Sequence, residues 1–209
     1  MNLIGNGAQY RAYDMLDGRV LKQPMTHSET IEVLTEWYAP DSIPDRYASD
    51  DYTVNAVNSY QFFKNLTVKY PKIADSLGNP IFLDDLSYSQ DKVQPLGDAL
   101  RTLYTKRGKL FIDAYADLII THWGYGFCDK VFNFTINNGI NNLGRVILLD
   151  FGEVSFSKAD IAKRIHSKRW LDAWSYTIDC PINLKEYYED KMNDSINLKK
   201  LNDTWKKAL

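Results

Sequence analysis

The beginning of the chain alternates apolar and polar positions in short runs, which is the period of half-buried strands. Leu3 and Ile4 lead into the turn Gly5-Asn6-Gly7, and residues 10–13 then alternate in the same way. A tight-turn pair, Asp17-Gly18, is followed by the alternating run 19–22. The pattern therefore predicts a strand, a glycine-rich turn, a second strand, a hairpin and a third strand.

The apolar spacing then changes to three and four residues, which is the period of a helix. We expect Ser28 to cap a helix from Glu29 to Tyr38, because its side chain can accept a hydrogen bond from the first turn. Two prolines and four aspartates between Pro40 and Asp51 indicate a loop. A second helix is expected over residues 52–68.

The rest of the chain mixes short strands with longer helical stretches. Gly108 is expected to separate two helices, because glycine is a poor helix former. The expected strands are 80–83, 88–93, 132–136 and 145–149, and the expected helices are 97–106 and 110–121, followed by a mainly helical tail. Strands and helices in this order predict the α+β class.

Composition and charge narrow the expected partners and compartment. The formal net charge is −2, with 25 Lys and Arg against 27 Asp and Glu, so neither nucleic-acid nor membrane binding is expected. Two cysteines exclude a disulfide framework and a zinc cluster. We see no signal peptide and no run of about 18 apolar residues. A cytoplasmic protein is expected, with signal-less secretion as an effector left open.

Two features near the N-terminus suit a nucleotide. Gly5 and Gly7 lie between two predicted strands, where backbone without a Cβ can approach phosphate groups. Lys22 ends the third predicted strand in the run Val20-Leu21-Lys22, which suits a lysine that faces the phosphates and a valine that packs on the base. Tyr10 stands where a third glycine of the phosphate-loop pattern is expected.

Carboxylates in the second half of the chain suit a metal ion. The apolar run 146–149 ends on Asp150-Phe151-Gly152, so a buried strand delivers a carboxylate and a glycine lets the chain turn. Asp129 precedes this run, and Asn133 follows Asp129 by four residues. Carboxylate and amide oxygens are ligands that Mg²⁺ accepts.

These pieces, in this order, resemble the protein-kinase superfamily. The resemblance implies that Asp129 accepts the proton of the substrate hydroxyl and that Asn133 and Asp150 bind the metal. Asn137 and Asn138 are rivals of Asn133. The triplet Phe127-Cys128-Asp129 replaces the family's His-Arg-Asp, and the Asp–Asn spacing is four rather than five.

The resemblance implies one kinase-like domain over residues 1–209 with a small β-sheet lobe and a reduced, mainly helical lobe. The expected boundaries are 1–93, which includes a hinge strand, and 94–209. Lys22 and Asp129 are the expected catalytic residues. The nucleotide-binding residues are expected to be Gly5, Gly7, Val20, Lys22 and Val93. A glutamate normally holds the lysine, and Glu29, Glu32 and Glu36 are all candidates.

The expected activity is phosphoryl transfer from ATP, with Mg²⁺, to a protein hydroxyl group. Only 57 residues follow Gly152, so a partner protein is expected to complete the reduced lobe. The alternatives are a pseudokinase, which binds nucleotide or protein without transfer, and a small-molecule kinase.

Two other patterns are interpreted as packing. His122 and Cys128 suggest a thiol nucleophile and its base, but a lone pair of this kind is more simply structural. Trp170, Trp174 and Trp205 form an aromatic stripe at helical spacing, which is typical of a core.

Overall fold

The computed structural model describes residues 1–38 and 51–206. The loop predicted for Pro40 to Asp51 lies outside these residues except for Asp51, which begins a helix. The chain forms two compact units, Met1–Lys92 and Val93–Leu209, and each is described by itself. Both contain strands and helices, which confirms the α+β class expected from the sequence.

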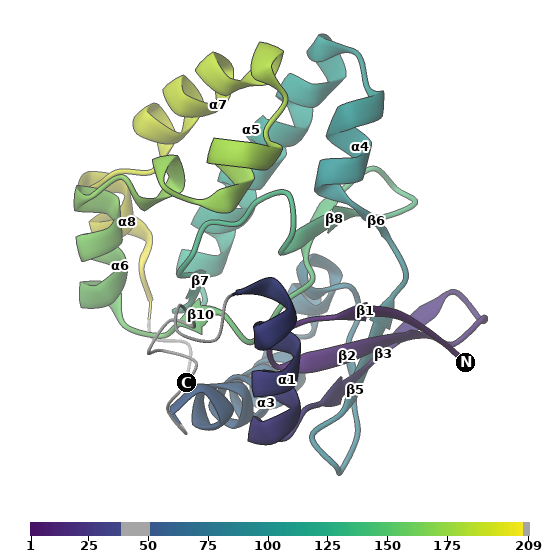
Figure 1. Cartoon of the computed structure of the whole chain (residues 1–209). Helices are drawn as coiled ribbons and strands as arrows, with labels where there is room; N and C mark the ends of the chain where they lie inside the picture. Colours follow the sequence, from purple (N-terminus) through teal and green to yellow (C-terminus); the bar gives the residue numbers. More distant parts are fainter. Residues whose placement is uncertain (39–50, 207–209) are drawn as a thin grey trace. The chain divides into compact units, whose positions relative to one another are not determined.

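An antiparallel five-stranded sheet organises the first unit (Figure 1). Its order is β1-β2-β3-β5-β4. The strands are β1 (Asn2–Asn6), β2 (Tyr10–Asp14), β3 (Arg19–Pro24), β4 (Ile81–Phe82) and β5 (Tyr88–Asp91). The three N-terminal strands and the turn at Asp17-Gly18 are confirmed, because alternation and turn residues agree there, whereas Gly5 and Asn6 of the predicted glycine-rich turn belong to β1.

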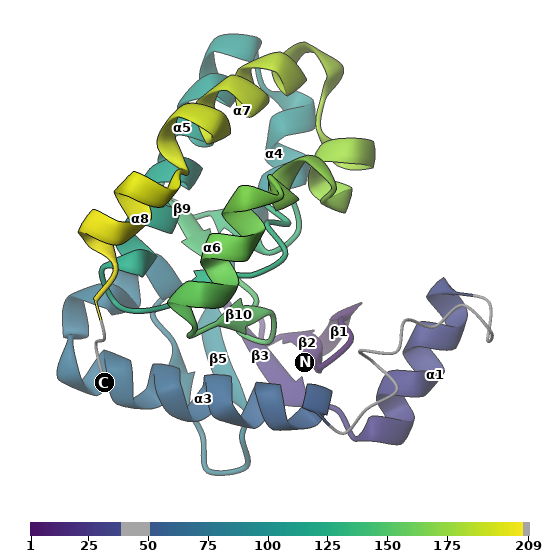
Figure 2. The same ribbon diagram turned by 90° about the vertical axis from the view of Figure 1, so that its left-hand side faces the viewer.

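The helices of the first unit are α1 (His27–Trp37), α3 (Asp51–Lys69) and the 3-10 helix η2 (Pro71–Leu77). The N-cap of α1 is Thr26, so the expectation of Ser28 was wrong. Thr26 forms a capping box with Glu29, which satisfies two backbone N–H groups at once. Figure 2 shows α3 running alongside the strands of the sheet.

Aromatic rings hold α3 to one face of this sheet. Tyr60 of α3 packs edge-on against Phe82, with ring centroids 5.2 Å apart, and Tyr10 packs edge-on against Tyr88 at the same separation. Tyr60 and Tyr88 are almost fully buried. The core of this unit is therefore an aromatic layer between helix and sheet.

Helices dominate the second unit. They are α4 (Leu96–Thr102), α5 (Thr105–Trp123), α6 (Lys158–His166), α7 (Ile182–Ser195) and α8 (Leu198–Thr204), with a 3-10 turn η3 (Arg169–Leu171) and a π-helical turn η4 (Ser175–Asp179). The strands are β6 (Gln94–Pro95), β7 (Cys128–Asp129), β8 (Asn138–Ile140), β9 (Val146–Leu148) and β10 (Val154–Ser155). They form a three-stranded sheet, β6-β8-β9, and a two-stranded sheet, β10-β7.

Two predicted elements of this unit were wrong. Gly108 does not end a helix but lies inside α5, where it is buried. A Cβ at Gly108 would lie 2.7 Å from Leu184 Cδ1 of α7. The absence of a side chain at this position therefore allows α7 to pack closely against α5. The strand predicted at 132–136 is absent from the described chain, and the strand begins at Asn138 instead.

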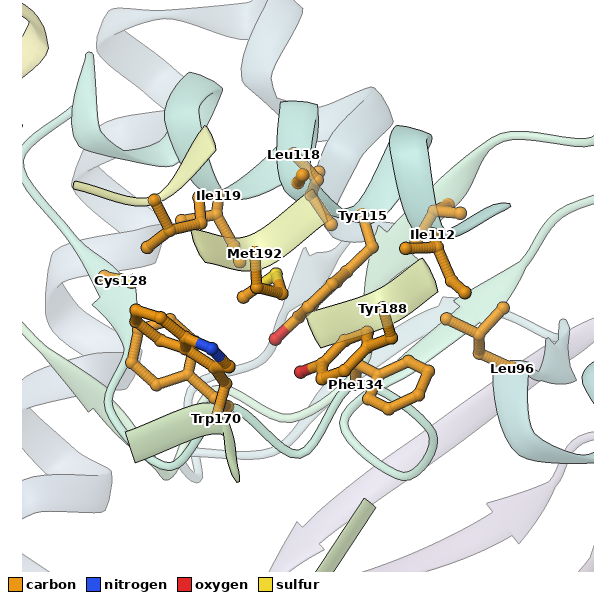
Figure 3. Close-up of a cluster of buried hydrophobic side chains, with 14 of the residues drawn as sticks. Leu96, Ile112, Tyr115, Leu118, Ile119, Cys128, Phe134, Trp170, Tyr188 and Met192 are labelled. Carbon is orange, nitrogen blue, oxygen red and sulfur yellow. The ribbon is translucent and has the colours of Figure 1, made fainter. Parts of the chain in front are cut away.

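The core of the second unit lies between α5 and α7, which run side by side (Figure 1). Figure 3 shows Tyr115 of α5 and Tyr188 of α7 close to Phe134 and Trp170. Trp170 is buried and Trp205 packs against the same cluster, but Trp174 is 56% exposed. The interpretation of all three tryptophans as core was therefore wrong for Trp174.

None of the helices in residues 1–38 and 51–206 is both long enough and apolar enough to cross a bilayer.

Candidate functional site

Asp129 is delivered by a short strand that follows the longest helix of the second unit. The helix α5 ends at Trp123, and Gly126 adopts a φ of 77°, a left-handed conformation that favours glycine. The chain then enters β7, where Asp129 pairs with Val154 of β10. The next residue, Lys130, donates its N–H to the backbone oxygen of Glu153 at 2.9 Å. Two strands therefore fix the backbone that carries Asp129.

Three hydrogen bonds fix the carboxylate of Asp129. Its Oδ1 accepts from the backbone N–H groups of Val131, at 2.8 Å, and Phe132, at 3.2 Å. Its Oδ2 accepts from Asn137 Nδ2 at 3.3 Å. Phe132 has a φ of 57°, which is rare for a bulky residue and turns its N–H toward the carboxylate. The orientation of Asp129 is thus set before any ligand binds.

Burial raises the pKa of Asp129 from 3.8 to about 6. Only 5% of the residue is exposed, and loss of hydration disfavours the charged form. The three hydrogen bonds lower the pKa, whereas the nearby Asp150 carboxylate raises it further. A carboxyl group with a pKa of about 6 is charged at neutral pH but accepts a proton more readily than an exposed aspartate does.

Asp150 follows the buried strand β9, as the sequence predicted. Its Oδ1 accepts the backbone N–H of Gly152 at 2.8 Å. The charge of Asp150 is a minor cause of the raised pKa of Asp129, which indicates that the two carboxylates lie near one another. Glu153 joins them: its Oε2 lies 3.4 Å from Asn137 Nδ2.

Two of the three candidate asparagines, Asn133 and Asn137, face different neighbours. The Asn137 amide nitrogen bridges Asp129 and Glu153, which leaves its Oδ1 as the atom able to bind a cation. The Asn133 Oδ1 instead accepts from the hydroxyl of Ser175 at 3.2 Å. The side chain of Asn137, one of the two rivals named from the sequence, therefore contacts Asp129, whereas that of Asn133 contacts Ser175.

The oxygen donors of this site are few. Among residues 1–38 and 51–206, no group of three or more His, Cys, Asp and Glu side chains is arranged to hold a metal ion. A cation here would rely on Asp150, the Asn137 amide oxygen, and oxygens supplied by a phosphate ligand and water. Magnesium sites that act on nucleotides are commonly of this kind.

Thiol chemistry at His122 and Cys128, which the sequence does not favour, has little support in the structure. Both His122 and Cys128 are buried. Burial lowers the pKa of His122 to about 3 and raises the pKa of the Cys128 thiol, so the imidazole stays neutral and the thiolate is disfavoured. A reactive cysteine needs the opposite shift. This agrees with the interpretation of both residues as packing.

Of the glycines predicted to approach phosphate groups, Gly5 lies near the end of β1 and Gly7 lies in the turn between β1 and β2. The register between strands β1 and β2 shifts between Leu3 and Gly5. The backbone N–H of Gly7 donates to the backbone oxygen of Tyr10 at 2.9 Å. A Cβ added at Gly5 would meet no described atom within 4 Å. The Tyr10 ring is buried against Tyr88, so it belongs to the core of this unit.

Lys22 and Val20 share one face of β3, because they are two residues apart. Lys22 pairs with Ala12 and Tyr88, and Val20 pairs with Asp14 and Gln90. Both are half-buried. They therefore lie on the sheet face that carries the buried Tyr88.

The three candidate glutamates differ in their surroundings. Glu29 accepts hydrogen bonds from Thr26 and pairs with Arg11 at 2.5 Å. Glu32 and Glu36 are exposed on α1. The capping role of Glu29 explains its place without Lys22.

The strand expected to form the hinge, residues 88–93, reaches the boundary of the two units, which falls between Lys92 and Val93 along the chain. The strand β5 ends at Asp91, and Lys92 pairs with Asp14 at 2.6 Å within the first unit. Val93 begins the second unit, where its Cγ2 lies close to Gly139: a Cβ on that glycine would be 2.5 Å away.

Three residues that contact the candidate site were not expected from the sequence: Phe132, Glu153 and Ser175. Glu153 directly follows Asp150-Phe151-Gly152, so its position was a usable signal. The left-handed φ of Phe132 and the approach of Ser175 from far along the chain have no local sequence signature. No protein-family model matches the chain, and it has no significant match among curated proteins. The chemistry of the site therefore rests on its own geometry.

Proposed function

We propose that the chain is an ATP- and Mg²⁺-dependent phosphotransferase with a two-lobed, kinase-like fold that acts on a protein hydroxyl group. The observation that supports this most directly is the Asp129 carboxylate, held by two backbone N–H groups and by Asn137 beside Asp150. Phosphoryl transfer needs positioning and charge neutralisation more than covalent chemistry by the protein. A fixed carboxylate beside two oxygen ligands suits that need.

Asp129 is the proton acceptor in this proposal. Its pKa of about 6 keeps it charged at pH 7, and its hydrogen bonds hold it in one orientation for an acceptor hydroxyl. General bases of this kind work best with a pKa near the working pH.

The donor set fits a hard cation, because Asp150 and Asn137 offer oxygen atoms. When bound with ATP, Mg²⁺ would neutralise charge on the phosphate oxygens. In the first unit, Lys22 and the backbone at Gly5 and Gly7 would contact phosphate groups. Val20 and Val93 would contact the base.

A nucleotide-binding pseudokinase is the alternative with a specific observation in its favour. Asp129 is only 5% exposed, which restricts the access of an acceptor hydroxyl. Whether the acceptor is a protein or a small molecule is tested by incubating the chain with γ-labelled ATP and acceptors of both classes and measuring the label transferred to each. Nucleotide binding without transfer to any of them would favour the pseudokinase.

The metal ligands give the sharpest test of the proposed site. We expect Asp150→Ala to abolish ATP turnover while the far-ultraviolet circular dichroism is kept. Asn137→Ala should raise the Mg²⁺ concentration for half-maximal turnover by at least about tenfold, as loss of a metal contact does. Asn202→Ala, which removes an exposed amide side chain of α8, is the matched control and should leave that concentration unchanged.

Full turnover by Asp150→Ala would refute the proposed metal site. A Mg²⁺ dependence altered by Asn133→Ala and not by Asn137→Ala would return the ligand role to Asn133.

A further inference from the structure

The segment Arg169–Asp179 connects α6 to α7 and has an unusual backbone. It begins with the 3-10 turn η3 and ends with the π-helical turn η4. Isolated π-helical turns are rare and often occur at functional sites. Two of its residues, Trp170 and Ser175, are almost completely buried.

Trp170 contacts the loop that holds Asp129. Its ring packs edge-on against Phe132, with centroids 5.8 Å apart and an interplanar angle of 70°. Figure 3 shows Trp170 within the same buried cluster as Cys128, the residue before Asp129. Phe132 is the residue in the left-handed conformation whose N–H reaches the Asp129 carboxylate. Such a conformation persists only where the surroundings enforce it, and the Trp170 ring is one such constraint.

Ser175 contacts the same loop at two further points. Its hydroxyl donates to Asn133 Oδ1 at 3.2 Å and accepts the Thr135 N–H at 3.4 Å. The Asn133 backbone oxygen in turn accepts the Asn137 N–H at 2.8 Å. The hydroxyl of Ser175 is therefore two hydrogen-bonded steps from the asparagine beside Asp129.

We propose that Trp170 and Ser175 are positioning residues of the candidate site, and that the segment Arg169–Asp179 sets the geometry of the loop between Asp129 and Asn137. Trp170 fixes the first half of the loop through Phe132, and Ser175 fixes the second half through Asn133 and Thr135. The effect on catalysis rests on the proposed phosphotransferase activity. The effect on the loop does not.

The primary test is Ser175→Ala in the full-length chain. Thr177→Ala is the matched control, since it removes a hydroxyl from the same segment whose partner is Ala173 and not the loop. Hydrogen exchange of the backbone amides at residues 131–137 should be about tenfold faster in Ser175→Ala, because hydrogen bonds that hold the loop are lost. Thr177→Ala should leave exchange in the loop unchanged.

The catalytic readout separates positioning from binding. Ser175→Ala should lower kcat by roughly ten- to a hundredfold, since small displacements of catalytic groups have effects of that size. The KM for ATP should stay within about twofold, because no nucleotide contact is removed.

Trp170 is tested by a graded pair. Trp170→Phe keeps an aromatic ring against Phe132, and Trp170→Leu does not. We expect Trp170→Phe to retain most of the slow loop exchange and most of the turnover, and Trp170→Leu to lose both. A purely structural role would instead lower the melting temperature of both variants without a selective change in the loop.

The outcomes separate this proposal from the proposed function. Equal loop exchange in wild type, Ser175→Ala and Thr177→Ala would overturn the positioning role. If the wild-type chain transfers no phosphate, the proposed function fails, and loop exchange alone still decides whether Ser175 and Trp170 hold the loop.

Discussion

At the scale of single residues, two of the ionisable groups buried in the second unit, Asp129 and His122, have pKa values that move in opposite senses. The pKa of Asp129 is raised to about 6 and the pKa of His122 is lowered to about 3. Burial is the main cause of both shifts. In each case the neutral form is favoured, as expected for a group removed from water. Asp129 nevertheless stays charged at pH 7, and its hydrogen bonds only partly offset the unfavourable burial.

The pKa of Asp129 predicts a pH-dependent cost in stability. Between about pH 4 and 6 the folded chain keeps a proton that the unfolded chain has released, so the free energy of unfolding falls as the pH rises through this window. Raising the pKa from 3.8 to about 6 corresponds to roughly 3 kcal/mol. Asp129→Asn should therefore be more stable than wild type at pH 7, by up to that amount, and the gain should vanish below about pH 4.

Urea unfolding across this pH range in the presence of a chelator measures the difference. The exposed Asp203 of α8 offers a matched control, since Asp203→Asn removes the same charge without burial. A gain of Asp129→Asn that is equally large at pH 4 and pH 7 would contradict the prediction.

At the scale of elements, the position of Gly108 is decided by the approach of α7 to α5. The Cβ of an alanine there would lie 2.7 Å from Leu184 Cδ1, and Leu184 is buried. Overpacking of this kind costs about 1–3 kcal/mol, whereas alanine in place of glycine inside a helix gains about 1 kcal/mol. We expect Gly108→Ala to lower the free energy of unfolding by roughly 1 kcal/mol.

The Leu184→Ala background reverses this prediction. Once the leucine is removed, the helix propensity of alanine remains and the clash does not, so Gly108→Ala should stabilise that background by about 1 kcal/mol. Chemical denaturation of the four chains gives the coupling. The same sign of the Gly108→Ala effect in both backgrounds would show that Leu184 is not the cause.

Local patterns predicted the elements whose shape depends on neighbours in the sequence. The strands around Asp17-Gly18 and the long helix α3 follow from alternation, turn residues and helical spacing. The prediction that Gly108 separates two helices was wrong because the requirement for glycine there comes from Leu184 of α7, which is far along the chain. The strand predicted at residues 132–136 was wrong because β-prone side chains there pack from a loop into the core. The contact of Phe132 with Trp170 is an example.

The candidate site follows the same division. Asp150 could be singled out because it follows a buried strand, whereas Asp129 was singled out through the resemblance to the protein-kinase superfamily and its strand β7 was not predicted. The side-chain contacts of Asn133 and Asn137 could not be predicted from the sequence. Spacing from Asp129 favoured Asn133, but the loop is long enough to turn the Asn133 side chain toward Ser175.

At the scale of the whole molecule, the proposed function requires ligand groups from both units. Lys22 belongs to Met1–Lys92, and Asp150 belongs to Val93–Leu209. If ATP with Mg²⁺ contacts both, Lys22→Ala and Asp150→Ala should each abolish the same thermal shift, although the two residues lie in different units. A nucleotide at about a hundred times its Kd adds about 2.7 kcal/mol of stability.

For a chain of this size, that stabilisation corresponds to a rise of roughly 5–10 °C in Tm. Differential scanning fluorimetry with ATP and Mg²⁺ should show this rise for wild type and for Lys199→Ala, which removes an exposed lysine of α8 and serves as the control. Lys22→Ala and Asp150→Ala should show almost none. If only one of them loses the shift, the nucleotide is bound by one unit alone, and a two-lobed site is refuted even where binding itself is real.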